Sequence, residues 1–174
     1  MRRRADREPA DRSRRGRLIA AALLSGGLAG CGFRLRGTQT LPFASVFIVA
    51  PATSAISEEL ARSIRAGTST QVLDARPAAQ AALEILSETR EADVLSVNAQ
   101  GRAREYRLRL RVVFRVVDGK GREFLAPTPV STTRDLAVRE DQLLAREYEE
   151  AQLYQDMLVD VAQQMLRRLA ALKA

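Results

Sequence analysis

The feature that most constrains the fold is a period of two between Tyr106 and Val117, in which apolar residues alternate mostly with arginines. Every second position from Tyr106 to Val116 is apolar. Arginine fills four of the six positions in between, which are Arg107, Arg109, Arg111 and Arg115. A period of two places alternate side chains on opposite faces of an extended strand. The sequence therefore predicts one strand, about 40 Å long at ~3.4 Å per residue, with an apolar face toward a core and a basic face away from it.

Turn sequences flank this strand on both sides. Asn-Ala-Gln-Gly at 98–101 precedes it, and Asp-Gly-Lys-Gly at 118–121 follows it. We expect partner strands at about 122–135 and at 81–97, the latter as one strand or as two that meet at a bulge. Two prolines, Pro127 and Pro129, cannot donate ladder hydrogen bonds, so strand 122–135 should lie at an edge or carry a bulge.

Two segments show the spacing of amphipathic helices. The first is framed by Ser54, an expected cap, and by Gly67, an expected end. The second runs from about residue 140 to residue 172 without glycine or proline. Its apolar positions step by three or four residues and are Tyr154, Leu158, Val161, Met165, Leu169 and Leu172. About 30 helical residues span about 45 Å, which matches the predicted length of the long strand.

The predicted elements define an α+β domain over residues 43–174. A short strand at about 45–50 precedes the first helix, so the order is strand, helix, three strands, helix. Val72-Leu73 is too short to predict as a strand. We expect a four-stranded, mixed but mostly antiparallel sheet with two helices on one face, the C-terminal helix being long.

The N-terminal segment reads as a targeting signal, so we expect residues 1–30 to be cleaved. Eight arginines precede an apolar stretch over 18–28, which is short of the ~20 residues that cross a bilayer. Leu28-Ala29-Gly30-Cys31 resembles a bacterial lipobox, which implies lipidation of Cys31 and a lipidated tether over 31–42. The alternative is an ordinary signal with a chance cysteine. Residues 13–18 partly resemble a twin-arginine signal, but the general secretory route is favoured.

Composition excludes several classes of function. The full chain carries a net charge of +7, but residues 1–30 hold eight of its 28 basic and three of its 21 acidic residues, which leaves +2. The basic balance is therefore no argument for nucleic-acid binding. The chain contains no histidine, and its one cysteine is assigned to lipid. We predict no catalytic residues, no metal site and no cofactor.

Three segments resemble the family of LPS-assembly lipoproteins, LptE. They are the opening 31–37 (CGFRLRG), the strand start 101–106 (GRAREY) and the helix end 163–169 (QQMLRRL). The order of the predicted elements from residue 31 onward also agrees. The resemblance implies a non-enzymatic protein that is anchored through Cys31 at the periplasmic face of the outer membrane. It further implies a plug and assembly partner of the LptD barrel that binds lipopolysaccharide. Glycine rather than aspartate at position 32 implies export to the outer membrane.

The resemblance also suggests lipopolysaccharide contacts. It places one of them at Arg146. The basic residue that the family carries near the 98–101 turn is replaced by Ala99, and Arg102 and Arg104 lie close enough to substitute for it.

The arginines of the long strand extend this candidate set. Guanidinium groups bind phosphates through two-point contacts, and lipid A carries phosphates. The further candidates are Arg107, Arg109 and Arg111. The alternative is a solvated sheet face on which arginines pair with acids such as Glu84, Glu88 or Glu123. Tyr106 is expected in the core, and Tyr148, which lies off the helical stripe, is left as a candidate barrel contact.

Two competing functions stay open at this stage. A scaffold lipoprotein of another envelope barrel or transporter would share the lipobox and the fold. A cell-wall hydrolase would need paired carboxylates in a cleft, for which Glu84 and Glu88 on one strand face are the nearest arrangement.

Overall fold

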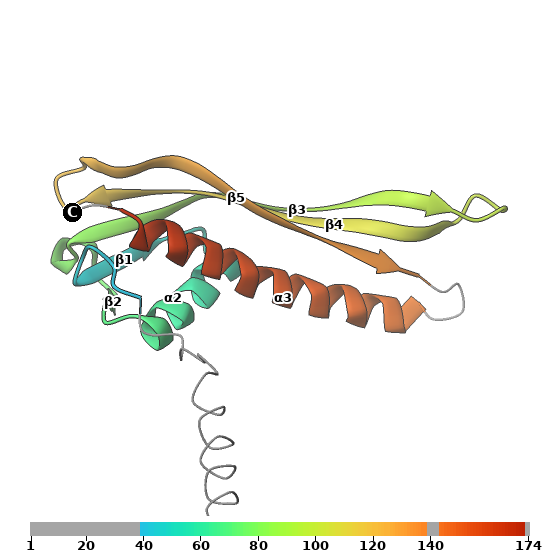
Figure 1. The fold of residues 1–174 in the computed structure, drawn as a ribbon, viewed down its shortest axis with the longest axis horizontal. Helices are drawn as coiled ribbons and strands as arrows, with labels where there is room; N and C mark the ends of the chain where they lie inside the picture. Colours follow the sequence, from blue (N-terminus) through green and yellow to red (C-terminus); the bar gives the residue numbers. More distant parts are fainter. Residues whose placement is uncertain (1–38, 139–142, 173–174) are drawn as a thin grey trace, which may run out of the picture. The chain divides into compact units, whose positions relative to one another are not determined.

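The computed structural model describes residues 39–138 and 143–172, which belong to a unit that begins at Thr38. The expectations for the signal at 1–30 and for Cys31 lie outside the described residues, as does most of the tether at 31–42. The described elements form two layers, with both helices on one face of a sheet (Figure 1). This arrangement is the predicted α+β class.

The sheet has five strands, so the prediction of four is wrong. Its spatial order is β2-β1-β3-β4-β5, with β2 and β3 parallel to β1 and the remaining pairs antiparallel. The strands are β1 (Ser45–Val49), β2 (Gln71–Leu73), β3 (Ala81–Val97), β4 (Ala103–Asp118) and β5 (Glu123–Ala137). The additional strand is β2, whose three residues are too few to carry a periodic signal but still pair with β1.

Strands β3, β4 and β5 form a long antiparallel meander. Both connecting turns are built in the same way. The Asn98 Oδ1 atom accepts hydrogen bonds from the backbone N–H groups of Gln100 and Arg102, and Asp118 Oδ1 does the same for Lys120 and Arg122. Gly101 and Gly121 close these turns with φ of 76° and 83°, a conformation that favours glycine.

Irregularities in β3 and β5 set which side chains share a face. In β3, Leu86 is an extra residue between the pairs Ile85↔Phe114 and Ser87↔Val113. Such a bulge reverses the faces of the side chains that follow. The segment 81–97 is thus one strand with a bulge, which is one of the two predicted alternatives. β5 is an edge strand and also has register shifts near its prolines, as predicted.

The first helix, α2 (Ala55–Gly67), confirms the predicted segment but has an unexpected cap. The Ser54 side chain does not bond to the helix; its hydroxyl donates to Glu88 Oε2 at 2.9 Å. The same carboxylate oxygen accepts the N–H of Ile56 at 3.3 Å. A carboxylate from β3 therefore occupies the positive end of the helix dipole.

The second helix, α3 (Leu143–Ala170), packs its predicted stripe against the sheet. Buried residues of this stripe meet the apolar face of β4, where Leu108, Leu110, Val112 and Phe114 are fully buried. The 28 residues of α3 span about 42 Å and the 16 residues of β4 about 54 Å. The hairpin of β3 and β4 consequently extends past the first turn of α3 (Figure 1).

Candidate functional site

The outer face of β4 carries the predicted row of arginines. Because Leu108 and Leu110 point into the core, the alternating Arg107, Arg109 and Arg111 lie on the face that no helix covers. Their guanidinium groups stand among side chains from β3 and β5, the two strands that flank β4. The pairing register therefore decides which arginines are neutralised.

Arg107 and Arg109 are engaged by acids on both sides of β4. Arg107 donates two hydrogen bonds to the carboxylate of Asp135, at 2.9 and 3.1 Å. Arg109 lies 3.0 Å from Glu91 and 3.6 Å from Asp93. The guanidinium of Arg107, through its hydrogen bonds and its charge, lowers the pKa of Asp135. These pairs agree with the alternative of a self-compensated sheet face.

Arg115 forms the most protected of these pairs. Its guanidinium lies 2.7 Å from Glu84, which is only 8% exposed, and 3.9 Å from Glu123. Arg76 also bonds to Glu84, at 2.9 Å. The hydrogen bond from Arg115 and the charges of both arginines lower the pKa of Glu84 against the opposing effect of burial. Glu84 and Glu123 are two of the three predicted acid partners.

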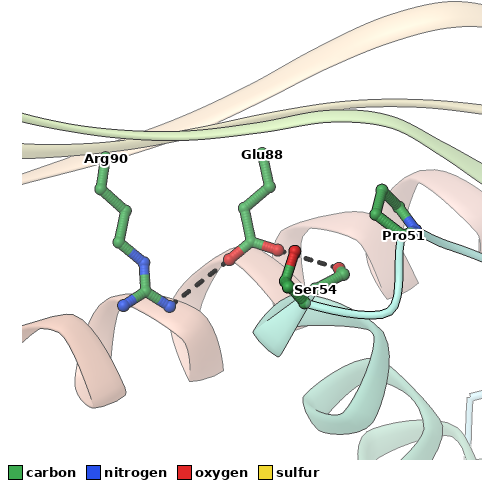
Figure 2. A pocket seen from close by; sticks show the side chains of 5 residues that line it. Pro51, Ser54, Glu88 and Arg90 are labelled. Carbon is green, nitrogen blue, oxygen red and sulfur yellow. Dashed lines mark hydrogen bonds and ion pairs between the residues drawn. The ribbon is translucent and has the colours of Figure 1, made fainter.

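Glu88 does not belong to this network, and the prediction that it shares a strand face with Glu84 is wrong. The bulge at Leu86 turns Glu88 to the helix side, where it caps α2 and lies 3.4 Å from Arg90 (Figure 2). The two carboxylates thus face opposite sides of the sheet, so they cannot act on one substrate. The described residues also contain no group of three potential metal ligands.

Two candidate arginines keep their charge available within residues 39–138 and 143–172. Arg111 lies opposite Thr89 and Ser131, neither of which carries a charge. Neither Arg111 nor Arg104 forms an ion pair within this part of the chain, and both are exposed. Arg102, at the end of the turn, is held there by its backbone N–H, which donates to Asn98 Oδ1.

Arg146 is brought to the same hairpin by stacking. Its guanidinium lies 4.3 Å from the centre of the Tyr106 ring, and Glu150 is 4.0 Å away on the next turn of α3. This cation–π contact fixes the position of the guanidinium while leaving its N–H edge free to donate. Tyr106 packs against the margin of the core rather than inside it, and Tyr148 is 70% exposed.

Sequence reasoning missed the acids that neutralise Arg107 and Arg109. Glu91 and Asp93 could have been found from the sequence. In a symmetric hairpin that turns at residue 100, Glu91 pairs with Arg109 and Asp93 pairs with Arg107. Asp135 could not have been found in this way. The register shifts in β5 place it opposite Arg107, which a symmetric hairpin about the second turn would not do. Arg90 was also missed; it stacks on Tyr154 with 5.3 Å between guanidinium and ring centre.

The described part of the chain is a two-layer α+β module with a projecting, charge-rich hairpin and no group of three potential metal ligands. No described helix is both long and apolar enough to cross a membrane.

Comparison with known proteins gives the family. Residues 43–169 match the LptE family, described as Lipopolysaccharide-assembly. The LPS-assembly lipoprotein LptE of Pectobacterium atrosepticum is 31% identical over 148 residues, which cover 81% of this chain and 77% of that protein. The chain belongs to the LptE family. The family is named for an assembly role, not for a catalysed reaction.

Solved structures agree with this assignment. An uncharacterized lipoprotein B from Nitrosomonas europaea is 38% identical with a TM-score of 0.69, covering 80% of this chain and 91% of that one. The rare lipoprotein B from Shewanella oneidensis shares the fold, with a TM-score of 0.62 at 20% identity over 73% of this chain and 94% of its own.

Proposed function

We propose that this protein is anchored through a lipid on Cys31 at the periplasmic face of the outer membrane, plugs and helps assemble the LptD barrel, and binds lipopolysaccharide during its insertion. Family membership supports the general role in lipopolysaccharide assembly. The observation that carries the binding role is the set of guanidinium groups presented at the hairpin without a strong acidic partner.

The lipopolysaccharide contact is assigned to the less neutralised cations. Arg104 and Arg111 have no ion pair in the described chain, and Arg146 has only a 4.0 Å pair with Glu150. Arg107 and Arg109 already donate hydrogen bonds to acids at 2.9–3.0 Å. A phosphate that binds to these two must displace a carboxylate, so it gains less free energy there.

A matched pair of variants tests this assignment. Replacing Arg104, Arg111 and Arg146 by Gln should weaken lipopolysaccharide binding at low salt by about tenfold or more, because charge-assisted contacts are lost. Replacing Arg107 and Arg109 by Gln should weaken it less. Equal losses in both variants, or unchanged binding in the first, would contradict the assignment. Binding is measured by isothermal titration with the purified lipoprotein.

The plug role is supported by the charged outer face of the hairpin. The outer face of β4 carries ion pairs with acids of β3 and β5. The lumen of a large outer-membrane barrel is polar, so its water and its polar side chains can contact such a surface. Photo-crosslinkers placed singly along 102–115 and 143–150 should capture LptD in cells. Capture of a different barrel as the stoichiometric partner would refute the role in LptD assembly.

The anchor is tested at the residue after Cys31. Gly32→Asp introduces the aspartate that retains bacterial lipoproteins at the inner membrane. The variant should move from the outer-membrane to the inner-membrane fraction in a sucrose gradient, whereas Gly32→Ser should not. Unaltered fractionation of Gly32→Asp would rule out lipid-directed sorting through Cys31.

A further inference from the structure

The sheet has a long unpaired edge along β3. β1 pairs with β3 only from Ala81 to Glu84. From Ile85 to Val97, no strand of the described chain lies on that side, which leaves about 40 Å of strand edge open. Such an edge offers backbone donors and acceptors to another extended chain.

The register identifies the groups that face outward. The N–H of Val138 donates to the carbonyl of Arg104, so the even-numbered residues of β4 direct their backbone groups to β5 and the odd-numbered ones to β3. Glu91 is paired with Arg109 and therefore faces β4. Residues alternate along a strand, so the outward backbone groups between the two bulges of β3 belong to Glu88, Arg90, Ala92 and Val94.

The opposite edge of the sheet is blocked. Pro129 lies opposite Val113, whose backbone faces β3, so the N–H that this proline lacks would have pointed to solvent. Pro127 lies two residues away along the same edge. Prolines are a common protection of edge strands against pairing. β3 contains none in its 17 residues, so the two edges differ in their capacity to accept a strand.

Two hollows lie beneath the open edge, between β3 and the helices. The larger has a volume of about 550 Å³ and is lined by Arg90, Ala92, Glu147, Glu150, Ala151 and Tyr154. The smaller has a volume of about 300 Å³; Glu88 extends into it from the strand toward Ser54, with Arg90 on its other side (Figure 2). Arg90 separates the two hollows. Glu88 and Ala92 are four residues, or about 13 Å, apart along the strand.

The larger hollow suits a cationic side chain. Its acids are Glu147 and Glu150, and its one basic lining residue, Arg90, is paired with Glu88 in the smaller hollow. Glu147 has no ion pair within the described chain, and Glu150 has only the 4.0 Å pair with Arg146. On a strand added to β3, every second side chain faces the same side as Arg90 and Ala92, where this hollow lies.

We infer that the open edge of β3 binds an extended, basic segment of a partner polypeptide by strand addition, with a cationic side chain entering the larger hollow beside Glu147 and Glu150. Backbone pairing supplies affinity in this mode, and the pockets for alternate side chains supply specificity. The inference is independent of the proposed function, because the edge can receive a strand whether or not the protein plugs a barrel.

The test uses the full lipidated protein in detergent and a synthetic ten-residue peptide. In this peptide threonine alternates with valine, and one central valine is replaced by lysine. At saturating peptide, amide hydrogen exchange over 86–97 should slow by about tenfold, as expected when roughly nine in ten molecules are occupied. The segment 123–137 should be unaffected. The same peptide with N-methyl groups on alternate residues should protect nothing, and a version with glutamate for lysine should bind more weakly.

Variants distinguish the edge from other surfaces. Ala92→Pro removes one outward donor and should abolish protection of the remaining β3 amides, whereas Ser131→Pro, the matched change on the β5 edge, should leave binding intact. Ala92→Lys keeps the backbone and should weaken lysine-peptide binding by adding a like charge, should the proline variant fail to fold. The inference is overturned by unchanged exchange over 86–97, by equal protection from the N-methylated peptide, or by dimerisation of the protein through this edge. LptD copurification of the same variants reports separately on the proposed function.

Discussion

The two halves of β3 lie in opposite environments although they form one continuous strand. Its first five residues are all buried, and none of the following twelve is. The first half lies between β1 and β4, whereas the second half has only β4 beside it, and its end projects past α3 as a hairpin (Figure 1). Stability and recognition are therefore divided along the strand: the buried half holds the domain together, and the exposed half presents its charge and its open edge.

The largest effect is expected from a cavity in the buried half. Phe114 is fully buried and pairs with Ile85 at the end of the buried stretch. Phe114→Ala should lower the free energy of unfolding by about 3–5 kcal/mol, measured by urea denaturation. Val97→Ser, at a position that is 57% exposed in the other half, should change it by less than about 0.5 kcal/mol. Comparable losses of unfolding free energy in the two variants would contradict the division of β3 into a stabilising and an exposed part.

A smaller effect is expected where the buried half contacts the polar face. Glu84→Gln keeps the size of the side chain but removes the charge between Arg115 and Arg76. The cost should be about 1–2 kcal/mol at neutral pH, because both arginines are partly exposed and can regain water.

The pH dependence of that variant has a definite sign. The pKa of Glu84 is lowered from its ordinary value of 4.5, so the ionised form stabilises the folded state above pH 4.5. This contribution is lost as the pH falls through the lower pKa of the folded protein. The unfolding midpoints of the wild type and Glu84→Gln should therefore converge in acid. A gap that stays constant from pH 7 to pH 3 would contradict the assignment.

The smallest effect is expected from releasing a paired arginine in the exposed half. Asp135→Asn removes the two-point partner of Arg107 on the surface. Thermal unfolding should be almost unchanged, whereas lipopolysaccharide binding should strengthen by about threefold, which is the scale of one exposed charge. Weaker binding would indicate that the ion pair itself positions Arg107 for the ligand.

Much of the fold was predictable because its elements are long and periodic. The alternation in β4 and the apolar stripe of α3 each repeat over several periods, so local noise does not obscure them. β2 was missed because a three-residue strand owes its pairing to β1 and α2 rather than to its own sequence. A cap contributed from β3 to α2 is a long-range contact, which no local motif encodes.

The sequence predicted which arginines lie on the candidate site, but not which of them form ion pairs. The arginine face follows from periodicity alone, whereas the availability of each arginine depends on the register of both neighbouring strands. Glu91 and Asp93 follow from a symmetric hairpin, but the shifts near Val116 and Val117 move Asp135 opposite Arg107. A bulge is specified by a balance of packing and twist over two strands, so its position is not readable from one strand.

The extra residue at Leu86 also limits how the chain length can vary in relatives. One residue inserted or deleted between Leu86 and Glu88 would exchange, as far as the next register shift after Val94, the face that meets α2 with the face that meets Arg109. Such a change would move Glu88 away from the N-terminus of α2 and would place Glu91 toward the helices. Changes of two residues would preserve both sets of contacts. Natural length variants of this segment should therefore differ by even numbers of residues, or carry a compensating bulge nearby.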